Sequence, residues 1–138
     1  MTEVKKSLPP EFTSLATIPH QSGNITVVEK GTTVSFDIRR VYFLHGLSGD
    51  SQRGSHAHKK LYQLMIAVSG SFQVSLTHSD WRKTYVMDDP TQGLLIPPMT
   101  WRVLSHFSTG AVCLVLASEN YDEADYIRDF DNFVIAGE

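Results

Sequence analysis

The sequence predicts an all-β domain of antiparallel strands, folded as a sandwich or a barrel. Turn-forming residues recur at short intervals along the 138 residues, as in SG at 22–23, GLSGD at 46–50 and STG at 108–110. The segments between these turns are short and rich in β-branched and aromatic residues, which is typical of strands. Helical periodicity is weak except in YDEADYIRDFDNF at 121–133, where one short helix is predicted. No linker or internal repeat divides residues 1–138, so a single domain is expected.

The predicted strands follow one another closely. NITVVE and TVSFDI are separated by a Lys-Gly turn, and RRVYFL follows directly. YQLMIAVSGSFQVSL predicts a tight hairpin at Ser69-Gly70, and VSLTHSDWRKTYV predicts a second hairpin with a longer polar turn. The runs GLLIPP, TWRVLSHF and AVCLVLAS complete the set. The strands are expected at residues 24–29, 33–38, 39–44, 62–68, 71–76, 83–87, 93–98, 100–107 and 111–118.

Composition and charge exclude several classes of function. A net charge of −3 with scattered basic residues gives no electrostatic reason to expect nucleic-acid binding. No stretch has the apolar length of a membrane span or of a signal peptide, so we expect a cytoplasmic protein that does not bind membranes. The lone Cys113 lies in the apolar run AVCLVLA, where a buried and unreactive thiol is expected.

Two histidines one residue apart, in RGSHAHKK at 53–60, are the main functional signal. Side chains alternate along a strand, so His56 and His58 should point the same way, with Cα atoms about 6.5 to 7 Å apart and Ala57 facing the other side. Two converging imidazoles could bind a divalent metal together with further ligands, or transfer protons because their pKa lies near neutral. They could also be two solvent-facing residues. The spacing alone leaves all three interpretations open.

The surrounding sequence resembles the cupin superfamily, whose members are antiparallel jelly-roll barrels. RGSHAHKKLYQLMIAVSG is similar to the first cupin signature and GLLIPPMTWRVLSHF to the second. Both depart from the metal-binding pattern, because Tyr62 stands at the glutamate position and Arg102 at the position of the third histidine. A guanidinium has no free lone pair to give to a cation. We therefore expect neither a metal nor another cofactor.

Within the cupins, the chain resembles the nucleotide-sugar 3,4-ketoisomerases over about residues 18–135. The matching segments are RRVYFLHG, RGSHAHKK, GLLIPPMTWR and the tail VLASENYDEADYIRDFDNF. This resemblance implies a single RmlC-like barrel with a short helical tail and a substrate of dTDP-4-keto-6-deoxyglucose. It also implies that the carbonyl moves from C4 to C3 through an enediol, as a step of deoxyamino-sugar biosynthesis. The product would supply a lipopolysaccharide or S-layer glycan.

The resemblance also implies roles for individual residues. His56 takes the role of base and His58 that of orienting partner or second proton carrier, although the sequence does not settle which of them removes the proton. Tyr42 would place a hydroxyl against the hexose, unless it is a core aromatic. The expected substrate-binding residues are Arg53, which suits a pyrophosphate, Arg102, Gln63, Ser22 and Tyr62. The acidic tail residues Asp122, Glu123 and Asp125 are expected on a solvated or interface surface.

Product stereochemistry is expected to depend on the positions of Arg102 and Ser22. Ketoisomerases return the C4 proton to one face or the other, and some members have histidine where this chain has Arg102. We predict that the arginine goes with the gluco product rather than the galacto product. Ser22 is small and favours neither.

The sequence leaves three other functions open. They are a metal-dependent cupin enzyme, a sugar-binding cupin without chemistry, and a dTDP-sugar 3,5-epimerase, whose family pairs its histidine with an aspartate and lacks the HAH stretch. Cupins of this size usually pair through sheet edges, which protects exposed strands. We therefore expect a homodimer formed by exchange of the N-terminal strands at 24–29 and 33–38.

Overall fold

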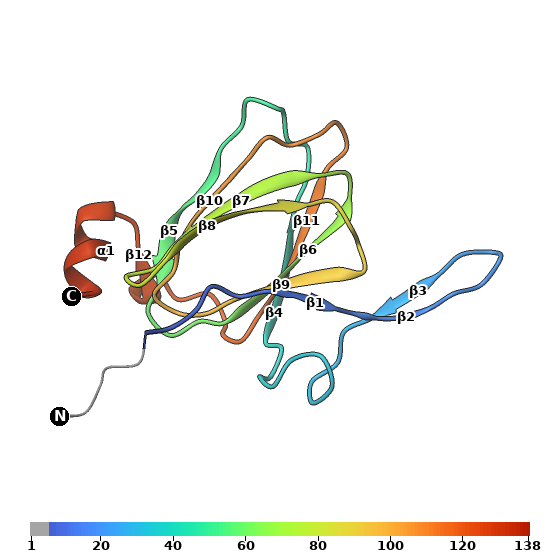
Figure 1. Cartoon of the computed structure of the whole chain (residues 1–138), viewed down its shortest axis with the longest axis horizontal. Helices are drawn as coiled ribbons and strands as arrows, with labels where there is room; N and C mark the ends of the chain where they lie inside the picture. The colour runs from blue at the N-terminus through green and yellow to red at the C-terminus, as the bar shows by residue number, and fades with distance from the viewer. Residues whose placement is uncertain (1–5) are drawn as a thin grey trace.

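Two five-stranded sheets face each other to form an antiparallel barrel in the computed structural model, which describes residues 6–138 (Figure 1). The first sheet has the order β1-β9-β6-β11-β4, made of β1 (Phe12–Ser14), β9 (Gln92–Ile96), β6 (Gln63–Ser69), β11 (Val112–Ala117) and β4 (Arg40–Leu44). The second has the order β12-β5-β10-β7-β8, made of β12 (Tyr126–Ile127), β5 (Arg53–His58), β10 (Trp101–Ser105), β7 (Phe72–Thr77) and β8 (Arg82–Met87). The predicted all-β fold is confirmed.

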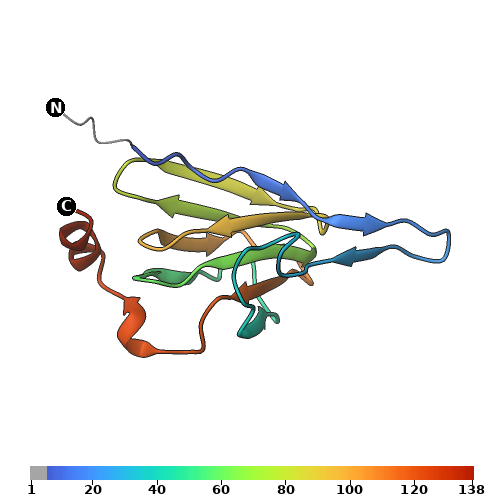
Figure 2. The same ribbon diagram turned by 90° about the horizontal axis from the view of Figure 1, so that it is seen from below.

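Two smaller elements lie outside the barrel. Strands β2 (Ala16–Ile18) and β3 (Ile25–Val27) form a hairpin that projects away from one end (Figures 1 and 2). At the other end, a 3-10 turn (Glu123–Asp125) leads through β12 into helix α1 (Phe130–Ala136). No helix within residues 6–138 is long and apolar enough to cross a membrane.

The main core fills the space between the sheets. Strands β7 and β10 alternate buried and more exposed residues, so Phe72, Val74 and Leu76 all point inward from β7. They pack against β6, β9 and β11, and Cys113 is buried there, as predicted. Burial raises the pKa of its thiol to about 12, which keeps it protonated and unreactive.

The predicted hairpin at Ser69-Gly70 is wrong. Strand β6 belongs to the first sheet and β7 to the second, so the chain crosses from one sheet to the other at this turn. Gly70 permits the crossing because its φ is +66° and a Cβ there would lie 2.9 Å from Ala111 Cα. The second predicted hairpin is confirmed, since β7 and β8 pair along their whole length.

The predicted strand at 33–38 is also wrong. Its alternating apolar residues, Val34, Phe36 and Ile38, pack on the outer face of the first sheet against Leu64 and Leu116. The alternation therefore reflects burial of one side of a loop, and only the isolated bridge between Lys30 and Val34 is strand-like. The helix predicted within 121–133 begins later, at Phe130, and the short strands β1, β2 and β12 were not predicted.

Candidate active site

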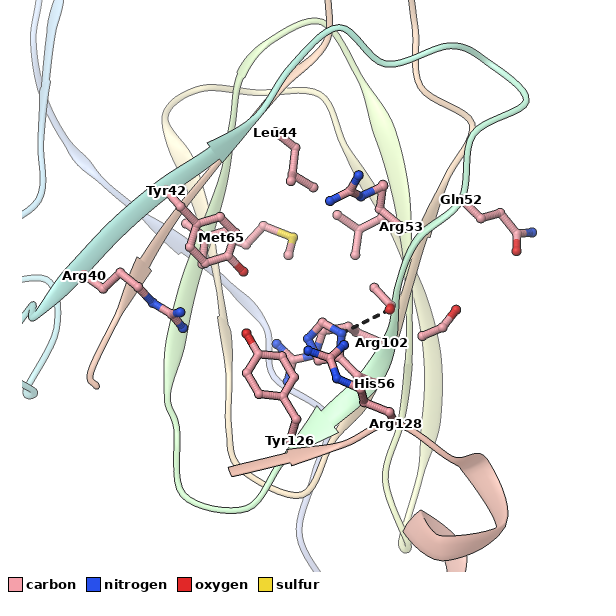
Figure 3. Close-up of a pocket in the computed structure, with 14 residues that line it drawn as sticks. Arg40, Tyr42, Leu44, Gln52, Arg53, His56, Met65, Arg102, Tyr126 and Arg128 are labelled. Atoms are coloured by element: carbon pink, nitrogen blue, oxygen red, sulfur yellow. Dashed lines mark hydrogen bonds between the residues drawn. The ribbon is translucent and has the colours of Figure 1, made fainter. Parts of the chain in front are cut away.

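A cavity of about 630 Å³ opens into the barrel between the two sheets (Figure 3). Strand β4 supplies one wall, β5 and β10 supply the opposite wall, and the tail supplies the rim through Tyr126 and Arg128. The lining residues are Arg40, Tyr42, Leu44, Gln52, Arg53, Gly54, Ser55, His56, Met65, Arg102, Leu104, Val115, Tyr126 and Arg128. The predicted residues Tyr42, Arg53, His56 and Arg102, which are far apart in the sequence, are thus brought together.

A β-bulge in strand β5 directs Arg53 and His56 into the cavity. The register against β10 shifts from Arg102 opposite His56 to Val103 opposite Gly54, which leaves Ser55 as the extra residue. Gly54 has φ +90° and Ser55 has φ +53°. Strict alternation would place Arg53 and His56 on opposite faces because they are three residues apart. The bulge removes that difference, so both line the cavity.

Gly54→Ala is expected to destabilise the fold by about 1–3 kcal/mol, since the φ is unfavourable for L-residues and the new Cβ would lie 2.9 Å from the Arg102 carbonyl oxygen. Urea unfolding measures the loss. Gly110→Ala is the matched control, because its φ is +77° but a Cβ there meets nothing within 4 Å. Equal losses in the two variants would contradict a specific requirement for glycine between β5 and β10.

The two histidines lie ring to ring, with centroids 4.9 Å apart and planes at 88°. Nδ1 of His56 is 3.1 Å from the Gly54 carbonyl oxygen, and Nδ1 of His58 is 3.1 Å from Asp125 Oδ2. A carbonyl and a carboxylate accept but do not donate, so both Nδ1 atoms carry the proton in the assigned tautomers. Within residues 6–138, both Nε2 atoms are buried and without a partner. Each ring therefore keeps a free lone pair on Nε2.

Burial and a neighbouring cation keep both rings neutral. Burial is the larger cause and the positive charge of Arg102 the second, and together they lower the pKa of His56 to about 4 and hold that of His58 well below its usual value. A neutral imidazole with a free Nε2 is a proton acceptor at neutral pH.

Activity that depends on neutral His56 is expected to persist well below the usual histidine pKa. The acid limb of kcat/KM should be half-maximal near pH 4, the pKa of His56 in the free protein. The folded state should also lose stability as pH falls from about 6.5 towards 4, because the unfolded chain binds protons first. Circular dichroism at each pH therefore accompanies the assay, and an acid limb centred at about 6.5 in folded protein would contradict this assignment.

Tyr42 presents a hydroxyl to the cavity from the wall opposite His56 (Figure 3). Gln63 Nε2 donates a hydrogen bond to its oxygen at 3.0 Å, so the tyrosine proton stays free to be donated. Burial raises the pKa of Tyr42, which keeps the hydroxyl protonated. Gln63 is itself fixed from behind, because its Oε1 accepts a bond from Arg102 Nη1.

Arg102 is buried in the wall of the cavity, and no carboxylate of residues 6–138 forms an ion pair with it. Its Nη2 donates to the Thr100 carbonyl oxygen at 3.1 Å, and its Nε is buried with no partner within the described chain. This arrangement does not fit a metal centre, because a fixed cation stands beside the histidines. No group of three or more histidine, cysteine, aspartate or glutamate side chains suited to a metal occurs in residues 6–138.

Several cavity residues were missed from the sequence. Arg40 and Arg128 line the cavity with Arg53 and Arg102, and none of the lining residues is acidic. Arg40 could have been found, because it precedes Tyr42 by two residues on the same strand and so shares its face. Arg128 lies 4.2 Å above the Tyr126 ring, which packs on both histidines, and only the tertiary structure places the tail there.

Four predicted residues do not line the cavity, namely His58, which lies behind His56, and Tyr62, Gln63 and Ser22. Tyr62 faces outward and stacks on Phe36, whereas its neighbour Gln63 points inward, so the position assigned to Tyr62 in the first signature belongs to Gln63. Gln63 supports Tyr42 and Arg102 from behind. Ser22 is exposed at the tip of the β2–β3 hairpin, away from the barrel of its own chain (Figure 2).

The expectation that Asp125 lies on a solvated or interface surface is wrong. Asp125 is buried, and the 3-10 turn places its carboxylate against His58. A histidine–aspartate pair therefore occurs here as well, and this feature does not separate the chain from the 3,5-epimerases. The HAH stretch remains the distinguishing feature.

The family described as FdtA: WxcM-like, C-terminal, matches residues 9–138. The chain belongs to this family. It is 40% identical over 111 residues to the TDP-4-oxo-6-deoxy-alpha-D-glucose-3,4-oxoisomerase of Aneurinibacillus thermoaerophilus, with 80% of each chain covered. The resemblance to the 3,4-ketoisomerases seen in the sequence is confirmed.

Solved structures of 3,4-ketoisomerases have the same fold. A mutant of the 3,4-ketoisomerase QdtA from Thermoanaerobacterium thermosaccharolyticum, in complex with TDP-4-keto-6-deoxyglucose, is 37% identical, with a TM-score of 0.91 and 96% of each chain covered. The TDP-quinovose 3,4-ketoisomerase WlaRB from Campylobacter jejuni is 36% identical, with a TM-score of 0.87, covering 91% of this chain and 97% of its own. The predicted cupin-type barrel is confirmed.

Proposed function

We propose that this protein is a sugar-nucleotide 3,4-ketoisomerase that converts TDP-4-keto-6-deoxyglucose to its 3-keto isomer. The observation that carries the proposal is the pair of neutral histidines with free Nε2 atoms in an arginine-lined cavity. The names of the relatives, an oxoisomerase and ketoisomerases of TDP-sugars, support the same activity.

His56 is the better candidate for the base, because it lines the cavity whereas His58 lies behind it. Its Nε2 takes the proton from C3, and the electrons of that C–H bond form a double bond between C3 and C4 while the C4 oxygen gains negative charge. A proton then returns to C4, and the proton of the C3 hydroxyl is transferred to the C4 oxygen, so that C3 becomes the carbonyl and C4 carries the hydroxyl. Hydrogen moves only as a proton, so the reaction needs no redox partner.

The cavity also offers groups for the charges of the substrate. Tyr42 can donate its free hydroxyl proton to the developing enediolate oxygen. Arginine forms two-pronged contacts with phosphate oxygens, which suits Arg40, Arg53 and Arg128 to the diphosphate. The sugar would then lie deep, beside the histidines, with the nucleotide towards the rim.

The direct test is an NMR time course of purified protein with TDP-4-keto-6-deoxyglucose in deuterated water containing EDTA. Formation of a 3-keto sugar with deuterium at C4 supports the proposal. Recovery of activity only after metal is added would favour a metal-dependent cupin enzyme, and exchange at C3 or C5 without carbonyl migration would favour an epimerase. Binding without any conversion would favour a sugar-binding protein.

Product stereochemistry is a finer part of the proposal. Arg102 is buried and lines the cavity together with His56, and we assign it to the gluco product. The same NMR experiment tests this assignment, because a small axial–equatorial coupling between H4 and H5 would identify the galacto product instead.

We further propose that the protein is a homodimer formed by exchange of its N-terminal hairpin. Strand β4 is an edge of the first sheet and exposes Val41 and Phe43, at 56% and 58% of their surfaces. The projecting β2–β3 hairpin exposes Ile18 and Ile25 to a similar extent. Pairing of one copy's hairpin with the other's β4 would cover both surfaces and give the exposed tip a second barrel to contact.

Val41→Glu is expected to shift the protein from dimer to monomer, because a charge would then lie in the apolar contact between the copies. Light scattering coupled to size-exclusion chromatography measures the mass. Val86→Glu is the matched control, since Val86 is 54% exposed on β8, an edge strand of the other sheet. A wild-type monomer, or an equal effect of both substitutions, would contradict an interface at β4.

A further inference from the structure

The tail carries a residue that contacts His58 from the side away from the cavity. His58 is fully buried, and its Nδ1 lies 3.1 Å from Asp125 Oδ2. The other carboxylate oxygen, Oδ1, accepts the Lys60 backbone N–H at 2.8 Å. Each oxygen of the Asp125 carboxylate therefore has one hydrogen-bond partner, His58 Nδ1 for Oδ2 and the Lys60 N–H for Oδ1.

Asp125 is itself held firmly in position. Its backbone carbonyl oxygen accepts the Lys59 N–H at 2.9 Å, and its N–H donates to the Asp122 carbonyl oxygen at 3.0 Å. The next residue, Tyr126, pairs with His58 across the β12–β5 ladder and packs its ring on the imidazole at 4.3 Å. The tail thus fixes both the rotamer of His58 and the partner of its Nδ1.

We propose that Asp125 is a positioning residue that holds His58 in the tautomer protonated on Nδ1, with the Nε2 lone pair directed away from the tail towards His56. His58 can then take up a proton on the side of the histidine pair. The catalytic part of this inference rests on the proposed isomerase function, whereas the tautomer is a property of the resting protein.

Asp125→Asn separates tautomer control from packing. Asparagine has the same shape but offers one acceptor and one donor. The Lys60 N–H requires the acceptor, so the amide NH2 must face Nδ1 of His58. The ring can satisfy that contact only by moving its proton to Nε2, which removes the free lone pair.

The first measurement is nitrogen NMR of protein labelled with 15N-histidine, with the signal of His58 assigned from its loss in His58→Gln. Wild-type protein should show Nδ1 protonated and Nε2 unprotonated, and Asp125→Asn should show the reverse. A wild-type His58 protonated on Nε2 would overturn the inference whether or not the variant folds, and so would an unchanged tautomer in the variant.

The second measurement is the kinetics of the same variant with TDP-4-keto-6-deoxyglucose. We expect kcat to fall by about 10- to 100-fold, the usual effect of losing an orienting partner, while KM changes by less than about twofold. Asp122→Asn is the matched control, because it removes the same charge from the same turn and asparagine still accepts the Ala124 N–H as the cap. An equal loss in both variants, or a change confined to KM, would contradict a role through His58.

These outcomes are separable from failure of the proposed function. If wild-type protein does not isomerise the sugar, the proposed activity is wrong, and the NMR result still decides the tautomer. If wild-type protein is active and Asp125→Asn retains full kcat, the activity stands and the positioning role is wrong.

Discussion

His56→Asn is expected to slow isomerisation of TDP-4-keto-6-deoxyglucose by about 10²–10⁴-fold, the usual contribution of a positioned general base. The His56 ring lines the cavity and donates its Nδ1–H to the Gly54 carbonyl oxygen, while its Nε2 has no hydrogen-bond partner within residues 6–138. Asparagine is polar and fits the space, but it has no basic nitrogen. The loss should therefore appear in kcat, with little change in KM, when product formation is followed by NMR.

The control for this substitution is His106→Asn. His106 is exposed and has φ +57°, a conformation that asparagine tolerates well. This variant should retain wild-type kcat and KM. An active His56→Asn protein with normal deuterium incorporation at C4 would show that His56 does not transfer the proton and would direct attention to His58.

Arg102→Met is expected to lower kcat by about 10²-fold and to move the acid limb of kcat/KM upward from pH 4. Arg102 is buried, supports Gln63, and is the main charge that depresses the pKa of both histidines. Removing the cation raises the pKa of His56, so a larger fraction of the ring is protonated at mildly acidic pH. The residual activity should therefore be lost at a higher pH than in the wild type.

Arg53→Met is the matched comparison for this prediction. Arg53 also lines the cavity, but it is exposed and is not among the charges that shift the pKa of His56. Its loss should raise KM through weaker diphosphate binding and leave the acid limb near pH 4. Identical pH profiles for Arg102→Met and wild-type protein would contradict the electrostatic role of Arg102.

The linear sequence was sufficient for the fold class and for part of the site. In strands such as β7, apolar residues recur at every second position. Side chains alternate between the two faces of a strand, so this pattern predicts a strand with one buried face. The HAH spacing likewise required both imidazoles to share a face, because Ala57 is the single residue between them. Arg102 was identified through the resemblance to the cupins, because it occupies the position at which a metal-binding member has its third histidine.

The sequence was less informative where local pattern and long-range partner differ. The run at 33–38 alternates like a strand but packs as a loop on the outside of a sheet, and Ser69-Gly70 resembles a hairpin turn but joins two sheets. Alternation shows that one side is buried and does not show what covers it. The same limit applies to Tyr62 and Gln63. Neighbouring residues of a strand face opposite sides, so aligning the signature one residue too early selected the outward Tyr62 in place of the inward Gln63.

By itself, the sequence determined an antiparallel β domain with two histidines on one face of a strand and an arginine near them. Local periodicity and residue chemistry are enough for the domain and the two histidines, whereas the arginine was placed near them by the resemblance to the cupins. Only the tertiary structure decided the hydrogen-bond partners of the two histidines, the bulge that turns Arg53 into the cavity, and the burial of Asp125 against His58. Each of these features depends on a contact between distant segments of the chain or on a register shift. Contacts and register shifts of this kind leave no periodic signal in the sequence.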